Sequence, residues 1–270
     1  MIGAIIGDIV GSRFEWHNIK TKEFDLFSKK CSVTDDSIMT LAIAKAILES
    51  ETMDDLSKNA EIWMQEIGRP YPYSGYGGSF YRWMYADDPA PFNSFGNGAA
   101  MRVSPCGFAA RSLPEAIAMS KAVTEVTHNH PEGIKGAEAT TVALYMARTG
   151  SSIDEIRKTI DAQYYPMNFT LDGIRDTYKF NETCQDTVPQ ALMAFFESTS
   201  FEDAIRNAIS IGGDSDTLAA IAGGVAEAYY GVPDDLRAQA IEYLDDRLES
   251  VLFAFEAKYG FPPERKESKQ

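Results

Sequence analysis

Apolar residues recur along this chain at the three- and four-residue spacings of α-helices, and strict alternation of apolar and polar residues is nearly absent. The pattern predicts helices over residues 37–49, 112–128, 131–150, 151–160, 186–198, 200–210, 216–231 and 233–260. Several of these segments are apolar on nearly all sides, which indicates helices in the buried middle of a multilayer bundle. We therefore expect an all-α fold, in which residues 164–171 are the best candidate for a strand.

Local signals support several helix ends. Ser112 with Glu115, and Ser152 with Glu155, have the spacing of capping boxes at helix N-termini. Gly150 follows the segment that begins at residue 131 and predicts where that helix ends.

The first apolar segment carries small residues at a four-residue spacing. Gly3, Gly7 and Gly11 allow another backbone to approach closely, so the run predicts a buried helix packed tightly on its neighbours. The run is too short to cross a bilayer, and Asp8 interrupts it. It also lacks the basic residues of a signal peptide. We expect a cytoplasmic protein that does not bind membranes.

Residues 68–107 lack a helical pattern and are rich in glycine, proline, tyrosine and asparagine. A long irregular stretch inside a compact domain is commonly functional, and the aromatic content argues against disorder. We interpret this region as ordered, non-helical loops around a site.

Composition adds limits on the class of protein. The chain has 270 residues and no low-complexity linker, which favours a single domain over residues 1–270. Its three cysteines are scattered and form no CxxC motif, which indicates reduced, buried thiols. The net charge of −15 disfavours binding to nucleic acid or anionic membranes, but it allows an anionic ligand where the site supplies local cations. We expect a monomer.

Carboxylates and hydroxyls gather at the starts of two apolar helices. The residues are Thr34, Asp35, Asp36, Asp214, Asp216 and Thr217. Capping explains one carboxylate at each helix start, whereas four carboxylates among apolar residues are costly to bury without a positive partner. The other Asp-Asp pairs fit first helical turns, a loop and, at 245–246, a polar stretch within a helix.

If the two helix starts meet, six oxygen ligands converge. Oxygen ligands suit Mg²⁺ or Mn²⁺, and four carboxylates suit two such ions in a dinuclear centre. Zinc is disfavoured because no histidine or cysteine cluster accompanies the carboxylates. An EF-hand is disfavoured because the segment from Asp214 lacks the glycine at position six and the later ligands.

Five motifs occur in the order found in ADP-ribosylglycohydrolases. They are GAIIGDIVGSRFEW at 3–16, TDDSIM at 34–39, SFGNGAAMRVSP at 94–105, THNHPEGIKGA at 127–137 and GGDSDT at 212–217. The chain resembles this family over roughly residues 1–231. The resemblance implies a compact, all-α hydrolase that uses two Mg²⁺ or Mn²⁺ ions to cleave the C1″ bond between ADP-ribose and an acceptor. Its partners would be ADP-ribose and ADP-ribosylated protein, and the six residues at the helix starts would be the metal ligands.

The same resemblance implies the other site residues. Glu15 would lie beside the metals and act in catalysis or gating, and Glu15, Asp35 and Asp36 are the candidates for the general base. The loops at 75–80 and 93–101 would hold the diphosphate and riboses. The candidate substrate-binding residues are Gly77, Gly78, Ser79, Ser94, Phe95, Asn97 and His128. We expect Arg102 to brace its loop and His130 to act as a cap.

The acceptor and two alternative functions stay open. The chain lacks obvious insertions, which favours arginine-linked ADP-ribose, as in the bacterial members of the family. One alternative is a catalytically silent protein that binds ADP-ribose. The other is a dinuclear-metal hydrolase of phosphoesters, because the glycine-rich loops would serve a phosphate equally well.

Overall fold

The computed structural model describes residues 1–260, which fold into helices joined by loops and contain no β-strand. The helices are α1 (Ile2–Ser12), α2 (Asp35–Leu48), α3 (Met53–Gly68), α4 (Gly78–Met84), α5 (Gly98–Met101), α6 (Ser104–Ala109), α7 (Leu113–Thr124), α8 (Pro131–Arg148), α9 (Ile153–Gln163), α10 (Leu171–Ile174), α11 (Cys184–Phe196), α12 (Phe201–Ser210), α13 (Ser215–Tyr230), α14 (Asp234–Ile241) and α15 (Asp246–Tyr259). The predicted all-α fold is confirmed.

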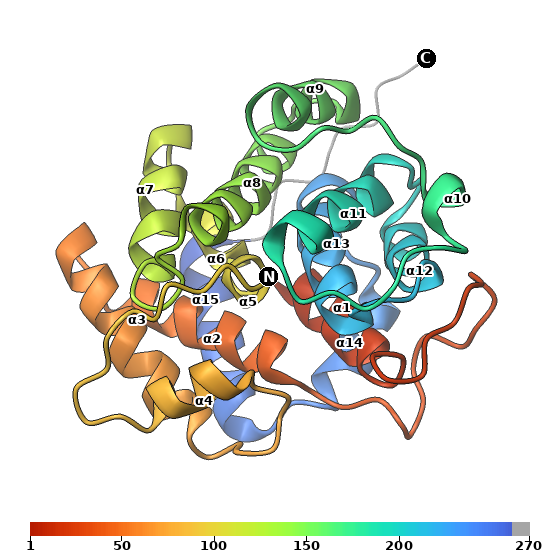
Figure 1. The fold of residues 1–270 in the computed structure, drawn as a ribbon. Coiled ribbons are helices and arrows are strands. Elements are labelled where there is room, and N and C mark those ends of the chain that lie inside the picture. The colour runs from red at the N-terminus through yellow and green to blue at the C-terminus, as the bar shows by residue number, and fades with distance from the viewer. Residues whose placement is uncertain (261–270) are drawn as a thin grey trace.

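Helix α13 is the central element of the bundle (Figure 1). Every residue of this helix from Ser215 to Ala228 is buried, which explains why its sequence lacks a polar face. Helices α1, α8, α11 and α12 pack around it, and α2 packs against α3 and α15 on another side of the molecule. The buried middle predicted from the apolar segments is therefore present.

Helices α1 and α13 cross unusually closely, and glycines make this possible. A Cβ atom at Gly3 would lie 2.4 Å from the carbonyl oxygen of Gly223, and one at Gly7 would lie 2.0 Å from that of Ala219. A Cβ atom at Gly11 would lie 2.5 Å from the Cα atom of Asp216. The tight packing predicted from the glycine spacing is confirmed. The pairing runs antiparallel, so the end of α1 meets the start of α13.

The predicted strand at residues 164–171 is wrong. Most of the segment is a loop between α9 and α10, and Pro166 removes a donor that a strand would need. Side chains satisfy its backbone instead. The N–H of Met167 donates to Asp161 at 2.7 Å, and its carbonyl accepts from Arg157 at 2.9 Å.

Two other expectations need correction. Residues 68–107 are not entirely non-helical, because they contain α4, α5 and most of α6. Stacking of Phe80 on Trp83 at 5.4 Å buries one face of α4, and Pro105 fits the first turn of α6. The segment 233–260 is two helices, because Asp245 caps α15 by accepting from two backbone N–H groups.

The capping predictions are confirmed in part. Ser152 and Glu155 form a complete capping box at the start of α9. Ser112 caps α7 by accepting from the N–H of Glu115, but the carboxylate of Glu115 accepts from the N–H of Arg111 instead of closing the box.

All three cysteines are free and buried, as predicted. Within residues 1–260, no helix is both long enough and apolar enough to cross a membrane.

Candidate active site

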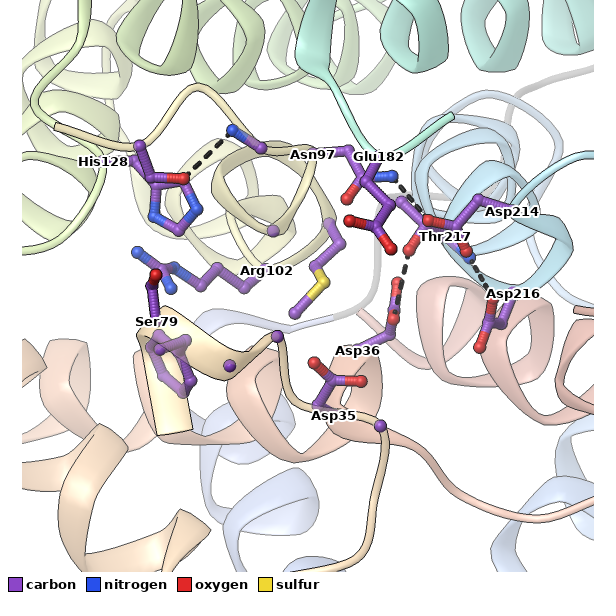
Figure 2. Close-up of a pocket in the computed structure, with 18 of the residues that line it drawn as sticks. Asp35, Asp36, Ser79, Asn97, Arg102, His128, Glu182, Asp214, Asp216 and Thr217 are labelled. Carbon is purple, nitrogen blue, oxygen red and sulfur yellow. Dashed lines mark hydrogen bonds between the residues drawn. The ribbon is translucent and has the colours of Figure 1, made fainter. Parts of the chain in front are cut away.

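A cavity of about 280 Å³ lies where the starts of α2 and α13 come together. The segment after α1, helix α4 with the loops on either side of it, helix α5, and the loops before α8 and α11 complete its lining. Figure 2 shows that acidic side chains gather on one side of this cavity, while Arg102, His128 and Ser79 lie on the other.

The acidic side brings together carboxylates from three distant segments. Asp8, Asp36 and Asp216 form one set, and Glu15, Asp214 and Asp216 form another. In each set, one oxygen of every carboxylate lies within 4.8 Å of the others. Asp216 belongs to both sets, as a carboxylate shared between two cations would. The antiparallel crossing of α1 and α13 explains why Glu15, just after α1, lies beside the start of α13.

Burial and mutual repulsion disfavour negative charge in this cluster. Burial is the largest cause that raises the pKa of Asp36 and Asp216 well above the usual range, and the neighbouring carboxylates add to it. Asp35 is raised in the same way, and the pKa of Asp214 is also raised. Burial raises the pKa of Glu15 to about 7, and Asp214 adds to that rise. A bound cation would reverse these shifts.

One buried oxygen of the cluster supports a cation directly. Oδ1 of Asp36 has no hydrogen-bond partner among the described residues, while Oδ2 accepts from the hydroxyl of Thr217 at 3.3 Å. A buried, unpaired carboxylate oxygen is costly unless a cation binds it. The donor set consists of oxygen atoms, which fits Mg²⁺ or Mn²⁺.

Asp8 belongs to the acidic cluster, although no role in the site was predicted for it. Its carboxylate accepts from the N–H of Thr34 at 3.0 Å, the hydroxyl of Thr34 at 2.6 Å, the N–H of Ser37 at 3.1 Å and the hydroxyl of Ser37. With four donors around it, Asp8 anchors the first turn of α2 and has little capacity left for a metal. The signal in the sequence was an acid inside an apolar run, which required buried partners.

The other predicted ligands occupy different places. Thr34 does not line the cavity, because its hydroxyl caps α2 by accepting from the N–H of Asp36 and donates to Asp8. Asp35 lines the cavity beneath the loop at Gly75. A Cβ atom on Gly75, where φ is +98°, would lie 2.8 Å from the Asp35 carboxylate, so glycine is needed there.

Two hydrogen bonds with the side chain of Asn18 hold the backbone of the GGDSDT segment (residues 212–217) at the start of α13. The side chain of Asn18 accepts from the N–H of Gly213 at 2.8 Å and donates to its carbonyl at 2.8 Å. Gly212 and Gly213 both have positive φ, of 69° and 80°, which lets the chain turn sharply into the helix. This turn aims Asp214 and Asp216 into the cavity.

The side of the cavity opposite the carboxylates has a different chemistry. Arg102 is the one cationic side chain among the described residues that line it, and it is fully buried. Its guanidinium donates to the hydroxyl of Thr127 at 2.5 Å and lies over the ring of Phe80 at 5.6 Å, which agrees with the expected bracing role. His128 also lines this side, whereas His130 caps α8 as predicted.

Most of the predicted substrate-binding residues line the same cavity. They are Gly77, Gly78, Ser79, Ser94, Asn97 and His128. Phe95 does not line it, because its ring is partly exposed and packs against His130 at 5.1 Å between centroids. Asn97 donates from its side chain to Asp214 at 2.7 Å, which ties the glycine-rich loop to the acidic cluster.

Glu182 lines the cavity, although no role in the site was predicted for it. It reaches the site because the loop before α11 pairs with the glycine-rich loop, through an isolated β-bridge between Gly96 and Thr183. The carbonyl of Glu182 accepts from the N–H of Asn97 at 2.7 Å. No local pattern marked Glu182, because the pairing joins segments far apart in the chain.

Comparisons with known proteins agree with this architecture. The family model for ADP-ribosylglycohydrolase matches residues 1–259. The chain is 27% identical to the ADP-ribosyl-dinitrogen reductase glycohydrolase of Rhodospirillum rubrum, over 92% of this chain and 90% of that protein. It is 24% identical to the ADP-ribosylhydrolase ARH3 of Homo sapiens, over 86% of this chain and 84% of that protein.

A solved structure shares the fold. It is described as an ADP-ribosylglycohydrolase-related protein complex and aligns with a TM-score of 0.67 at 21% identity, covering 95% of each chain. Because the family model spans almost the whole chain, the chain belongs to the ADP-ribosylglycohydrolase family.

Proposed function

We propose that this protein is a metal-dependent hydrolase that cleaves the C1″ bond between ADP-ribose and an acceptor and releases ADP-ribose. The observation that carries the proposal is the polarity of the cavity. Carboxylates line one side, and the buried guanidinium of Arg102 lies with the glycine-rich loops on the other. This suits a ligand with an anionic diphosphate at one end and a sugar at the other. The relatives that act on ADP-ribosylated substrates support the same assignment.

We propose two Mg²⁺ or Mn²⁺ ions as the cofactors. Asp36, Asp214 and Asp216 would hold them, Asp35 and Thr217 would complete the oxygen set, and Glu15 would lie beside them. When bound, such ions lower the pKa of a water molecule and attract the hydroxyl groups of a sugar. The unpaired Oδ1 of Asp36 supports this arrangement, and so does the position of Asp216, whose carboxylate lies within 4.8 Å of those of Asp36 and Asp214.

The diphosphate would bind on the side of Arg102. The backbone N–H groups around Gly77, Gly78 and Ser79 are available to phosphate oxygens, and Asn97 and Ser94 line the path toward the carboxylates. The guanidinium of Arg102 would place positive charge beneath the diphosphate without leaving the core. In this orientation, the C1″ atom would lie near the carboxylates.

Glu15 is the general base that we favour over Asp35 and Asp36. Its carboxylate lies within 4.8 Å of those of Asp214 and Asp216, and its side chain is partly exposed, so it can accept a proton from a water molecule at the edge of the cluster. In the reaction, a water oxygen bonds to C1″ while its proton passes to the Glu15 carboxylate. The bond from C1″ to the acceptor breaks, and the acceptor atom leaves with the electron pair and takes up the proton that Glu15 received from the water.

Arginine-linked ADP-ribose is the substrate that we propose, because of the residues at the exposed end of the cavity. Glu182 places an exposed carboxylate at the cavity. Trp16, which is 71% exposed, stacks on Phe180 at 5.0 Å, and Phe180 lines the cavity. An acid next to stacked aromatic rings suits a guanidinium group, which binds carboxylates and lies over ring faces.

The test is release of free ADP-ribose from arginine-, serine- and acetyl-linked substrates, with Mg²⁺, with Mn²⁺ and after chelation. We expect metal-dependent release, fastest from the arginine-linked substrate. Asp216→Asn is expected to abolish release, whereas Asp235→Asn, in an Asp-Asp pair outside the cavity, is expected to retain it. Tight binding of ADP-ribose without release from any linkage would leave a silent binder. Release of phosphate would indicate a phosphoester hydrolase.

A further inference from the structure

A chain of hydrogen bonds leads from the buried guanidinium of Arg102 to the ring of His128. Arg102 donates to the hydroxyl oxygen of Thr127 at 2.5 Å, and that oxygen lies 2.8 Å from Nδ1 of His128. All three residues are buried. The direction of the second hydrogen bond determines which ring nitrogen of His128 carries the proton, and therefore what the ring offers to the cavity.

The hydroxyl proton of Thr127 has two possible acceptors, and one of them is already occupied. The carbonyl of Thr124 lies 3.3 Å from this hydroxyl, but it accepts from the backbone N–H of Thr127 at 3.1 Å and from that of His128 at 2.8 Å. These two bonds use both lone pairs of the carbonyl oxygen. Nδ1 of His128 is closer to the hydroxyl than this carbonyl is, so it is the better acceptor.

The charge of Arg102 also favours donation from the Thr127 hydroxyl to Nδ1 of His128. A guanidinium that donates to the Thr127 oxygen polarises the hydroxyl, which strengthens it as a donor and weakens it as a second acceptor. The opposite arrangement would point an Nδ1–H group toward a cation in a buried region. Burial and the proximity of Arg102 also lower the pKa of His128 well below its usual value, so the ring is neutral.

We propose that Arg102 and Thr127 are positioning residues that hold His128 as the Nε2–H tautomer, so that the ring donates a hydrogen bond to a phosphate oxygen of the ligand. The Nε2 atom faces the glycine-rich loop. Cβ atoms built on Gly96 and Gly98 would lie 3.6 Å and 3.5 Å from it. No described residue accepts a hydrogen bond from Nε2, and His128 lines the cavity beside Arg102 (Figure 2). The choice of phosphate as the acceptor rests on the function proposed above.

The tautomer can be read directly by long-range ¹H–¹⁵N correlation spectra of the ring nitrogens. The chain has only three histidines, and His128→Asn assigns the signal. In the wild-type protein we expect a protonated Nε2 and an unprotonated Nδ1 at neutral pH, with or without ligand. A protonated Nδ1 would overturn the proposal, whatever the protein binds.

Variants of Thr127 test whether this residue fixes the tautomer. Thr127→Val removes the hydroxyl at nearly constant volume and is expected to give a mixture of tautomers. Its dissociation constant for ADP-ribose, measured by calorimetry with Mg²⁺, should rise about three- to tenfold, the value of one hydrogen bond. Thr127→Ser restores the hydroxyl and should restore both the tautomer and the affinity.

Thr124→Val is the matched control. It makes the same substitution three residues earlier, at a buried hydroxyl that has no hydrogen-bond partner among the described residues. We expect it to leave the tautomer and the affinity unchanged. If Thr127→Val behaves like Thr124→Val, the proposed relay is wrong. If the wild-type protein shows the Nε2–H tautomer but does not bind ADP-ribose, the proposed function fails while the tautomer assignment stands.

Discussion

Two adjacent glycines of α13 should respond in opposite ways to the same substitution. A Cβ atom at Gly223 would lie 2.3 Å from the carbonyl oxygen of Gly3 and 2.8 Å from the side chain of Ile205. At Gly224 the nearest atom would be Cβ of Ser104 at 3.4 Å, which is ordinary van der Waals contact. The pair Gly223→Ala and Gly224→Ala therefore isolates the effect of the close crossing from the effect of helix propensity.

The expected magnitudes follow from two opposing contributions. Replacing glycine by alanine inside a helix gains about 0.8–1 kcal/mol of propensity at either position. At Gly223 the new methyl group must push a backbone away by about 1 Å, and overpacking of this kind costs about 3 kcal/mol. We therefore expect Gly223→Ala to lower the free energy of unfolding by about 2 kcal/mol. Gly224→Ala should raise it by up to about 1 kcal/mol.

Urea denaturation followed by circular dichroism measures both values under one condition. The difference of about 3 kcal/mol corresponds to a separation of roughly 5 °C in melting temperature for a protein of this size. Equal stabilities for the two variants would refute the reasoning, because they would show that α1 and α13 do not touch through their backbones. Unchanged slopes against urea would confirm that the variants differ in stability and not in compactness.

Three further predictions concern the acidic cluster. Asp216→Asn should weaken Mg²⁺ binding, measured by calorimetry, by at least about 100-fold, because it removes the carboxylate that both sets share; tight binding by this variant would exclude the shared position. Asp8→Asn should lower the free energy of unfolding by about 2–3 kcal/mol, because an amide presents donors to the N–H and hydroxyl groups that Asp8 accepts; wild-type stability in chemical denaturation would contradict its role as the anchor of α2. The stability of the metal-free protein should fall as the pH rises from 4.5 to 8, because burial raises the pKa of Glu15 from 4.5 to about 7 and raises the pKa of Asp36. Protonation therefore stabilises the folded state, and this stability is lost as each group ionises. Melting temperatures in EDTA measure the trend, saturating Mg²⁺ should reverse it, and a flat profile in EDTA would contradict it.

The features that could be predicted from the sequence are those marked by a pattern within a few consecutive residues. A carboxylate at the start of an apolar helix is visible within a few residues, so Asp36, Asp214 and Asp216 could be found without knowing what they face. The close packing of α1 was also visible, because three glycines shared one face. Capping by Ser152 and Glu155 depends on four consecutive residues and was confirmed for the same reason.

The parts that were missed depend on pairings across the chain. Asp8 gains its role from Thr34 and Ser37, which lie in the next helix. Glu182 reaches the cavity through the bridge between Gly96 and Thr183. The predicted strand at 164–171 failed for a related reason: its backbone bonds to side chains of α9, and no neighbouring strand is present among the described residues.

The antiparallel crossing of α1 and α13 also sets an order of events during synthesis. Helix α1 leaves the ribosome before α13, which covers the glycine face of α1 and is synthesised about 200 residues later. At typical rates of translation, this interval lasts roughly 10–40 s. During that time the apolar surface of α1 must be covered by temporary contacts or by a chaperone. The repulsion among the carboxylates is postponed for the same interval, because Asp214 and Asp216 are synthesised after most of the scaffold that will hold them.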